Sequence, residues 1–438
     1  MKKQTLKGQA ALTAAGTALV RGLGFVLRLW LSRLLGAEAL GIMELASGAH
    51  MLALTPAVAG LPGAVSRTTA RAGREDERLL TLYAGRRMAW ALGLIVTPLF
   101  FLASPWIARW MGDERTLPAL LLFTPCVLTV GLSSVYDGYF FGRGNALPPA
   151  ASELAEQIVR MAAVAALAGL VPRLTAAYRA AVPAFASTLG EAAGLAVIVG
   201  IAGRIPSYKK DARLTTRKRE LRRLSAPLLL NRLCHTGLRS LCNVVIPLRL
   251  MAGGLEKAEA MSRLGMFSGM VMPLMFLPCM LSGALSTVGG PAAARCRSKK
   301  AECRLIRRLL IFAIGGGAVC AAGLYMLAPA LARYFFRLPE LTGLIRASCP
   351  LALILPVQQV SNGLMTGLGR QKRSLRASLL GSALLLALTW VWAPAFGIRG
   401  AAWASMAGHG LTLLLELASL LLPAGARLSS GKSAEEKE

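Results

Sequence analysis

The sequence predicts an all-α polytopic membrane protein, with about 12 transmembrane helices in two six-helix lobes around a central cavity. Of its 438 residues, 55% are hydrophobic, and they fall into long runs rich in Leu and Ala. Glycine occurs 45 times, and small residues let helices approach closely in a bilayer. Only helices and closed barrels satisfy the backbone in lipid, and these runs are too long for barrel strands.

Twelve apolar segments are long enough to cross a bilayer. They lie near residues 9–34, 39–66, 82–110, 117–141, 147–170, 178–203, 224–251, 260–289, 305–332, 341–368, 375–395 and 399–422. A strongly basic stretch at 204–223 divides them into an N-terminal lobe, residues 1–203, and a C-terminal lobe, residues 224–425. The polar end of the chain, residues 426–438, is expected to be a disordered tail.

The first apolar segment, residues 8–36, carries two arginines, Arg21 and Arg28. A spacing of seven residues places both on nearly the same helix face, about 10 Å apart along the axis. A central arginine costs about 2.5–3.5 kcal/mol on insertion scales, so both should face a polar interior. Because guanidinium binds phosphate oxygens through a bidentate fork, the segment predicts a cavity that receives a phosphate-bearing anion.

The seventh segment repeats this pattern with Arg232 and Arg239, which are also seven residues apart. His235 lies between them near the same face, and an imidazole that titrates near neutral pH could respond to a bound anion. Matching pairs in equivalent spans favour a transporter built from two repeats, with its site at their interface. Snorkelling or structural pairing of the arginines is the alternative.

Acidic residues inside the spans are candidates for charge balance or ion coupling. Glu44 in the second span could balance the arginines of the first or bind a coupling cation, and the sequence favours the balancing role. Asp137 and Glu191 are the other candidates, and Glu191 has no partner nearby in sequence. Glu156 and Arg160 are four residues apart and predict a structural ion pair on one helix.

Neutral polar residues in the later spans allow two interpretations. Gln358, Gln359 and Asn362 in the tenth span could offer hydrogen bonds to a sugar, or could simply join neighbouring helices. His50 and His409 are interpreted as hydrogen-bonded packing residues.

The formal net charge is +29, from 50 Lys and Arg against 21 Asp and Glu. The basic residues lie mainly between apolar segments and accompany no nucleic-acid-binding motif, so they indicate attraction to anionic membrane lipids rather than to nucleic acid. The basic runs fall on one side of the predicted topology. By the positive-inside rule, both termini are expected in the cytoplasm of a bacterial cell, with the chain crossing the plasma membrane many times.

Eight scattered cysteines have no CxxC spacing and form no zinc motif with the histidines, so no metal site is predicted. The sequence has no GxSxG, nucleotide-binding glycine loop or HExxH motif, and it therefore predicts neither an enzyme nor a cofactor.

Several stretches resemble a known family in the expected order. They are KQTLKGQAALTAAG and VRGLGFVLRLWLSRLLGAEALGIMEL near the start, GLPGAVSR, FTPCVLTVGLSSVYDGYFFGRGN, SELAEQIVR, LPCMLSGALSTVGGP and GLGRQKRS. The chain is thereby identified as similar to the stage V sporulation protein B family. That family is part of the polysaccharide-flippase branch of the superfamily that also contains MATE exporters and lipid II flippases.

The resemblance implies a flippase that moves a polyprenyl-diphosphate-linked saccharide, such as a peptidoglycan precursor, from the inner to the outer leaflet by alternating access. A role in the spore cortex is implied by the family name. Two features depart from relatives: the chain has about twelve spans where lipid II flippases have fourteen, and Asp137 is an acid where a basic or neutral residue is expected.

Two other functions stay open from the sequence. A MATE-type antiporter of cations or drugs would need a cavity dominated by carboxylates, against which the arginine pairs argue. A membrane scaffold without transport activity would act by recruiting cell-wall synthesis enzymes as partners.

Overall fold

The computed structural model describes residues 6–203, 205–206, 208, 212–294, 296 and 298–421, with the side chains of some residues near the ends of these ranges and within α1, α8 and α11 left out. The predicted tail at 426–438 lies outside the described residues. Throughout the described part the chain is helical and contains no strand. The all-α prediction is confirmed.

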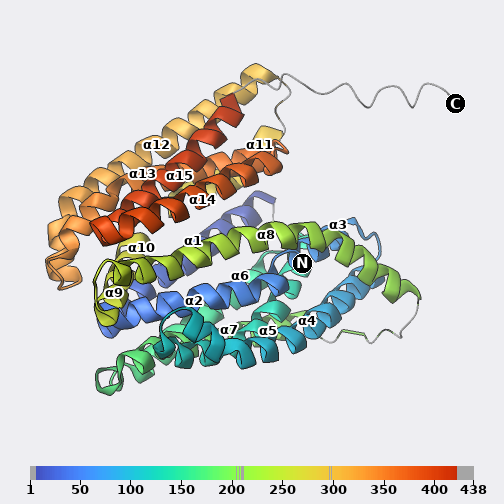
Figure 1. Ribbon diagram of the computed structural model, residues 1–438. Helices are drawn as coiled ribbons and strands as arrows, with labels where there is room; N and C mark the ends of the chain where they lie inside the picture. The colour runs from blue at the N-terminus through green and yellow to red at the C-terminus, as the bar shows by residue number, and fades with distance from the viewer. Residues whose placement is uncertain are drawn as a thin grey trace.

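The N-terminal lobe consists of α1 to α7 (Figure 1). Its helices are α1 (Leu6–Leu35), α2 (Ala37–Val58), α3 (Leu61–Arg71), α4 (Glu75–Trp110), α5 (Leu117–Gly142), α6 (Leu147–Leu167) and α7 (Ala176–Ala202), with short 3₁₀ turns η1 (Glu114–Thr116) and η2 (Val171–Arg173). The predicted second span is broken between α2 and α3 at Ala59 and Gly60, immediately before Pro62 at the start of α3.

The C-terminal lobe consists of α8 to α15. Its elements are α8 (Ala212–Ala252), α9 (Lys257–Leu264), the π-helix η3 (Gly265–Val271), α10 (Met272–Met275), α11 (Leu277–Ala294), α12 (Lys299–Ala330), the π-helix η4 (Leu331–Phe335), α13 (Leu341–Gly367), α14 (Gln371–Phe396) and α15 (Ile398–Leu421). Residues 212–223, which the sequence predicts in the linker, form the start of α8, because nothing between Ala212 and Ser225 breaks a helix.

The second span of each half is interrupted in the same way. In the N-terminal half, α3 begins at Leu61 with Pro62 in its first turn, and in the C-terminal half, α11 begins at Leu277 with Pro278 in its first turn. A proline cannot donate the backbone hydrogen bond that would continue the preceding helix, but it fits the first turn of a new one. This shared break supports the predicted internal repeat.

The elements form about twelve membrane-length rods, as predicted. Seven stretches of the described chain are long and apolar enough to cross a membrane by length and composition: Ala37–Arg71, Glu75–Trp110, Glu114–Gly142, Ala176–Ala202, Lys300–Phe335, Leu341–Gly367 and Gln371–Phe396. The remaining rods are α1, α6, α8, α15 and the run from α9 to α11. Of these, α1, α6, α8 and α15 carry charged side chains within their apolar stretches, which lowers their hydropathy.

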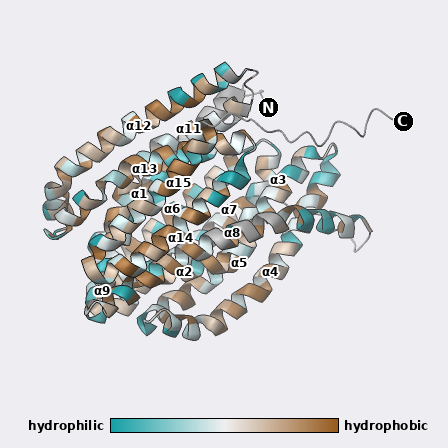
Figure 2. Cartoon of the chain, turned by 45° about the horizontal axis from the view of Figure 1, so that its top comes forward, coloured by the Kyte–Doolittle hydropathy of each residue, from teal (hydrophilic) through white to brown (hydrophobic). Residues whose placement is uncertain are grey.

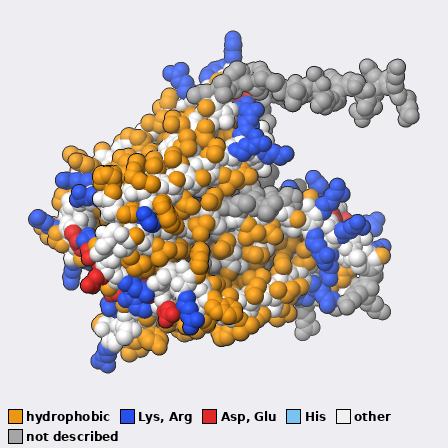
Figure 3. Space-filling model, viewed as in Figure 1, with side chains coloured by type: hydrophobic (Ala, Val, Ile, Leu, Met, Phe, Trp, Pro, Cys, Tyr) orange, Lys and Arg blue, Asp and Glu red, His pale blue; other side chains and the backbone are white. Residues whose placement is uncertain are grey.

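Apolar side chains cover the outer surface of the long helices (Figures 2 and 3). On α4, Leu102 and Trp106 are 68% and 71% exposed, and on α12, Val319 and Met326 are 74% and 79% exposed. Apolar surface on this scale is unfavourable in water but not in lipid. Lys and Arg side chains gather toward the ends of the molecule, as expected for a protein that spans a bilayer (Figure 3).

The two lobes meet at one end of the molecule, here called the closed end, where α2 packs against α9 and η3. Gly41 and Gly265 make this contact possible, because a Cβ on Gly265 would lie 2.7 Å from the backbone nitrogen of Gly41. At the other end α8 packs on α3 and α4, while α11 to α15 diverge from the N-terminal lobe (Figure 1). The molecule is therefore closed at one end and open at the other.

Candidate functional site: a basic cavity between the lobes

A cavity of about 1310 Å³ lies between the lobes. It is lined by α1 and α2 of the N-terminal lobe and by α8, η3, α10, α11, α13, α14 and α15 of the C-terminal lobe. A volume of this size exceeds that of a typical drug-sized site, which is about 300–1,000 Å³. The predicted central cavity is present.

Arg28 lies on the α1 side of this cavity. Its guanidinium forms an ion pair with Glu44 on α2 and also donates a hydrogen bond of 3.3 Å to the carbonyl oxygen of Ser268 in η3. Arg28 therefore connects α2 of the N-terminal lobe with η3 of the C-terminal lobe, next to the closed end. The carboxylate of Glu44 balances the charge of Arg28, which is the role that the sequence favours for Glu44.

Arg21 lies two turns earlier on α1 and also lines the cavity. Among the described residues it makes no hydrogen bond and no ion pair, and it is exposed. Its guanidinium lies beside α11, because a Cβ on Gly283 would lie only 2.9 Å from Arg21 Nη1. Glu153 on α6 interacts with Arg21 electrostatically without forming an ion pair, so the guanidinium keeps its hydrogen-bond donors for a ligand in the cavity.

Of the second predicted arginine pair, only Arg232 has a described side chain. Arg232 on α8 is exposed but is not among the described residues that line the cavity, because the cavity-lining face of α8 begins near Cys242 and Asn243. The side chains of His235 and Arg239 lie outside the described residues.

The remaining acids gather inside the N-terminal lobe rather than in the cavity. Arg160 forms ion pairs with Glu156 on its own helix α6 and, at 3.5 Å, with Glu191 on α7. Asp137 on α5 is close enough to interact electrostatically with Glu153 and Glu156. Arg160 therefore links α6 to α7 and is the partner for Glu191 that the sequence does not reveal, whereas Asp137 faces carboxylates of like charge.

The α13–α15 side of the cavity is polar but uncharged. Gln358 Oε1 on α13 lies 3.0 Å from His409 Nδ1 on α15, and Gln359 Oε1 accepts a 2.8 Å hydrogen bond from Ser282 on α11. His409 is therefore a cavity residue rather than the packing residue predicted, since only the helix arrangement reveals its contact with Gln358. By contrast, His50 is buried and stacks on Phe123, with ring centroids 4.4 Å apart.

The charge of the cavity is positive among its described lining residues. Arg21, Arg28 and Glu44 are the charged residues in that set, and Glu44 is already paired with Arg28. In a site partly shielded from water such a field attracts anions and repels cations.

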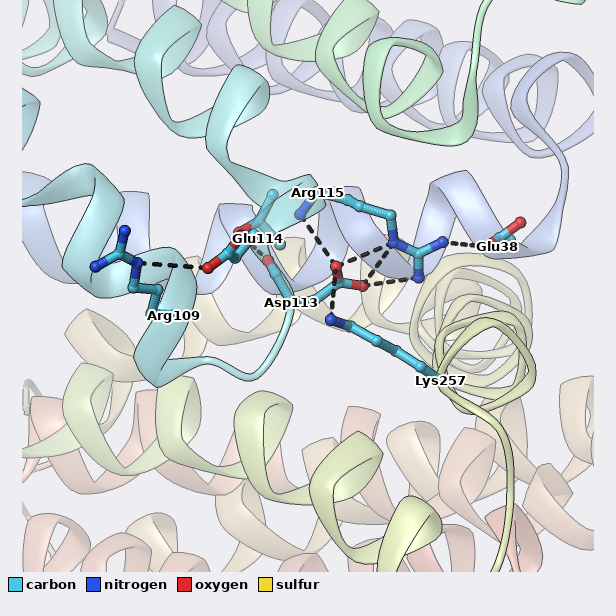
Figure 4. Close-up of polar contacts among 7 residues, drawn as sticks. Glu38, Arg109, Asp113, Glu114, Arg115 and Lys257 are labelled. Carbon is cyan, nitrogen blue, oxygen red and sulfur yellow. Dashed lines mark hydrogen bonds and ion pairs between the residues drawn. The ribbon is translucent and has the colours of Figure 1, made fainter.

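Charged residues also join the lobes at the closed end (Figure 4). Asp113, in the connection between α4 and α5, is 0% exposed and accepts a hydrogen bond of 2.9 Å from Arg115 Nη2, while Lys257 Nζ at the start of α9 lies 3.6 Å away. Arg115 also contacts Glu38 at 2.5 Å. None of these four residues is among the site residues predicted from the sequence.

Comparison with known proteins agrees with this architecture. The family model described as "Polysaccharide biosynthesis protein" matches residues 6–297. Stage V sporulation protein B of Bacillus subtilis (strain 168) is 31% identical over 444 residues, covering 96% of this chain and 84% of that protein. Lipid II flippase MurJ of the same organism is 26% identical over 173 residues, covering 37% of this chain and 32% of that protein.

Solved structures share the fold. An inward-facing multidrug resistance MATE family transporter of the MOP superfamily aligns with a TM-score of 0.71 at 15% identity, covering 92% of this chain and 93% of that one. Lipid II flippase MurJ in an inward closed conformation aligns with a TM-score of 0.70 at 14% identity, covering 94% and 87%. At this identity the likeness establishes the fold.

The two-lobed helical fold and these relatives define a class of multi-span helical membrane proteins that shares its fold with the solved MATE transporter and MurJ structures. Within it, the chain belongs to the polysaccharide biosynthesis protein family, and stage V sporulation protein B is a relative along nearly its whole length.

Proposed function

We propose that the protein flips a polyprenyl-diphosphate-linked saccharide from the inner to the outer leaflet of a bacterial plasma membrane by alternating access. The observation that carries this proposal is the cavity lined by Arg21 and Arg28, in which Arg21 is exposed and makes no ion pair with the described residues and the Arg28 side chain is 37% exposed. Guanidinium groups with available donors suit the oxygens of a diphosphate.

The relatives support a lipid-linked substrate. One of them is named lipid II flippase MurJ, and this chain matches it in part of its sequence and in fold. A peptidoglycan precursor is therefore the first substrate to test, and a contribution to the spore cortex follows if the function of the B. subtilis relative extends to this chain.

In the proposed cycle the head group enters from the open end. We assign this end, with both termini, to the cytoplasm, because it carries the basic segments around residues 67–78 and 298–308 (Figure 3). The diphosphate binds Arg21 and Arg28, the closed end then separates, and the head group leaves outside while the polyprenyl chain stays in lipid.

The decisive experiment uses purified protein in liposomes. A fluorescent undecaprenyl-diphosphate saccharide placed in one leaflet should reach the other leaflet only in vesicles that contain the protein. A neutral-linked analogue with the same sugar and lipid should be moved poorly. Equal transport of both lipids would overturn the role of the arginines, absence of any lipid transport would favour a scaffold, and efflux of ethidium would favour a cation antiporter.

A further inference from the structure

The cavity has two chemically distinct faces, and the proposed function uses only one of them. The α1 face carries the guanidinium groups of Arg21 and Arg28. The opposite face, formed by α11, α13, α14 and α15, carries amides, hydroxyls and an imidazole, and its described lining residues include no Asp, Glu, Lys or Arg. We call this the neutral wall and define it by Gln358, Gln359, Asn362, Ser378, Ser382 and His409.

The neutral wall is rigid, because its helices touch backbone to backbone. At the α14–α15 crossing, a Cβ on Gly381 would lie 2.5 Å from the carbonyl oxygen of Gly408. At the α11–α13 crossing, a Cβ on Gly290 would lie 2.8 Å from the carbonyl oxygen of Gly363. Side chains on rigidly packed helices keep their positions, which a selective site requires.

Part of the wall is already oriented by hydrogen bonds. The Gln358 carbonyl oxygen is held by His409 at 3.0 Å, and the Gln359 carbonyl oxygen is held by Ser282 at 2.8 Å. Each contact engages the amide oxygen and leaves the NH₂ group as a donor.

The rest of the wall offers groups that are not yet used. Asn362 is exposed to the cavity, and Ser378 and Ser382 are half-buried at its surface. None of the three side chains makes a hydrogen bond with the described residues. Together they present donors and acceptors to whatever occupies the cavity.

The two faces meet at Gly283 on α11. A Cβ there would lie 2.9 Å from Arg21 Nη1 and 3.3 Å from Gln359 Nε2, so a guanidinium of the α1 face and an amide of the neutral wall converge on one point. Arg21 and Gln359 both line the cavity, so a ligand that contacts both would pass from anionic to neutral chemistry within a few bonds. A sugar attached directly to a diphosphate has this arrangement.

We propose that the neutral wall is a saccharide subsite that selects uncharged, hydroxyl- and amide-bearing sugars next to the diphosphate. This inference rests on the proposed function. Neutral amides and hydroxyls can pair with sugar hydroxyl and acetamido groups. A uronic acid or a free amino sugar would place a charge against a wall that offers it no partner of opposite sign, and an unpaired charge is costly to desolvate.

The test compares three polyprenyl diphosphates as competitors of fluorescent-lipid transport: one carries N-acetylglucosamine, one glucuronic acid and one no sugar. The wild-type protein should prefer the N-acetylglucosamine form over the glucuronic acid form by at least about tenfold. Gln358→Met and Asn362→Leu should each weaken competition by the N-acetylglucosamine form about three- to tenfold. Competition by the sugar-free diphosphate should be unchanged. Asn362→Arg should improve competition by the glucuronic acid form.

Controls separate this subsite from the diphosphate site and from folding. Arg21→Lys should weaken all three competitors alike, and Ser348→Ala, a fully buried position on α13 outside the cavity lining, should change none. If the sugar-free diphosphate competes but Gln358→Met and Asn362→Leu leave sugar preference unchanged, the saccharide subsite is refuted while the proposed function stands. If none of the three lipids competes, the proposed function itself fails.

Discussion

Lys257 and Asp113 connect the two lobes at the closed end, with Lys257 Nζ 3.6 Å from a carboxylate oxygen of Asp113 (Figure 4). Asp113 is fully buried and is also held by Arg115 of its own lobe, so it keeps a partner when Lys257 is absent. The lysine is therefore the part of this contact that can be released when the lobes separate.

The first prediction concerns this contact. In a cysteine-free background, Ala260→Cys, buried on α9, should react slowly with a thiol reagent. Adding Lys257→Gln should speed the reaction about two- to fivefold, because an ion pair that is half exposed is worth up to about 1 kcal/mol. Lys300→Gln, exposed at the start of α12, serves as the control. An unchanged rate in Lys257→Gln would show that the contact does not hold the closed end.

The second prediction concerns the glycine contact between α2 and η3. Gly265→Ala should prevent full closure and reduce transport at least about tenfold, because its Cβ would meet the backbone of Ala37 and Gly41. The measurement is lipid transport in liposomes at matched protein content. Gly316→Ala on α12 meets open space and should transport normally. Wild-type activity in Gly265→Ala would mean that the helices need not approach this closely.

The third prediction concerns the cavity arginines. Arg21→Lys should reduce affinity for a diphosphate lipid about tenfold or more, since a lost charge-assisted hydrogen bond costs about 1.5–3 kcal/mol. Arg21→Ala should be worse, while its insertion into the membrane should be unchanged or better. Arg232→Lys, outside the cavity lining, is the matched control. A greater effect from Arg232→Lys than from Arg21→Lys would reverse the assignment of the site.

The fourth prediction concerns Glu44. Glu44→Gln should lower the free energy of unfolding in detergent by about 1–2 kcal/mol, because Arg28 loses its ion pair. This loss is intermediate between the losses expected for surface and buried ion pairs, because the Arg28 side chain is 37% exposed and the Glu44 side chain is 12% exposed. In a double-mutant cycle, adding Glu44→Gln to the Arg28→Gln variant should lower the free energy of unfolding little further. Additive losses would show that the two residues act independently.

The fifth prediction concerns orientation. In the cysteine-free background, a membrane-impermeant thiol reagent added to intact cells should label Glu256→Cys, in the exposed connection between α8 and α9. It should not label Ser298→Cys, which is exposed before α12 at the open end. Permeabilised cells provide the control for reactivity at Ser298. Labelling of Ser298→Cys in intact cells would invert the proposed topology.

The fold class and part of the cavity could be predicted from the sequence. Apolar run length predicts helices that span a membrane, because backbone groups in lipid must be satisfied within the helix. The Arg21–Arg28 spacing placed both residues on one face, and the cost of exposing charge to lipid turned that face inward. These inferences depend on periodicity within a single helix.

The tertiary structure alone decided contacts between helices distant in the chain. The same seven-residue spacing in Arg232 and Arg239 did not place Arg232 in the cavity, because α8 turns that part of its surface outside the cavity lining. His409 meets Gln358, and Lys257 meets Asp113, only through the packing of helices from different parts of the chain. Periodicity orients a side chain on its own helix, but the rotation and partners of that helix are set by packing against its neighbours.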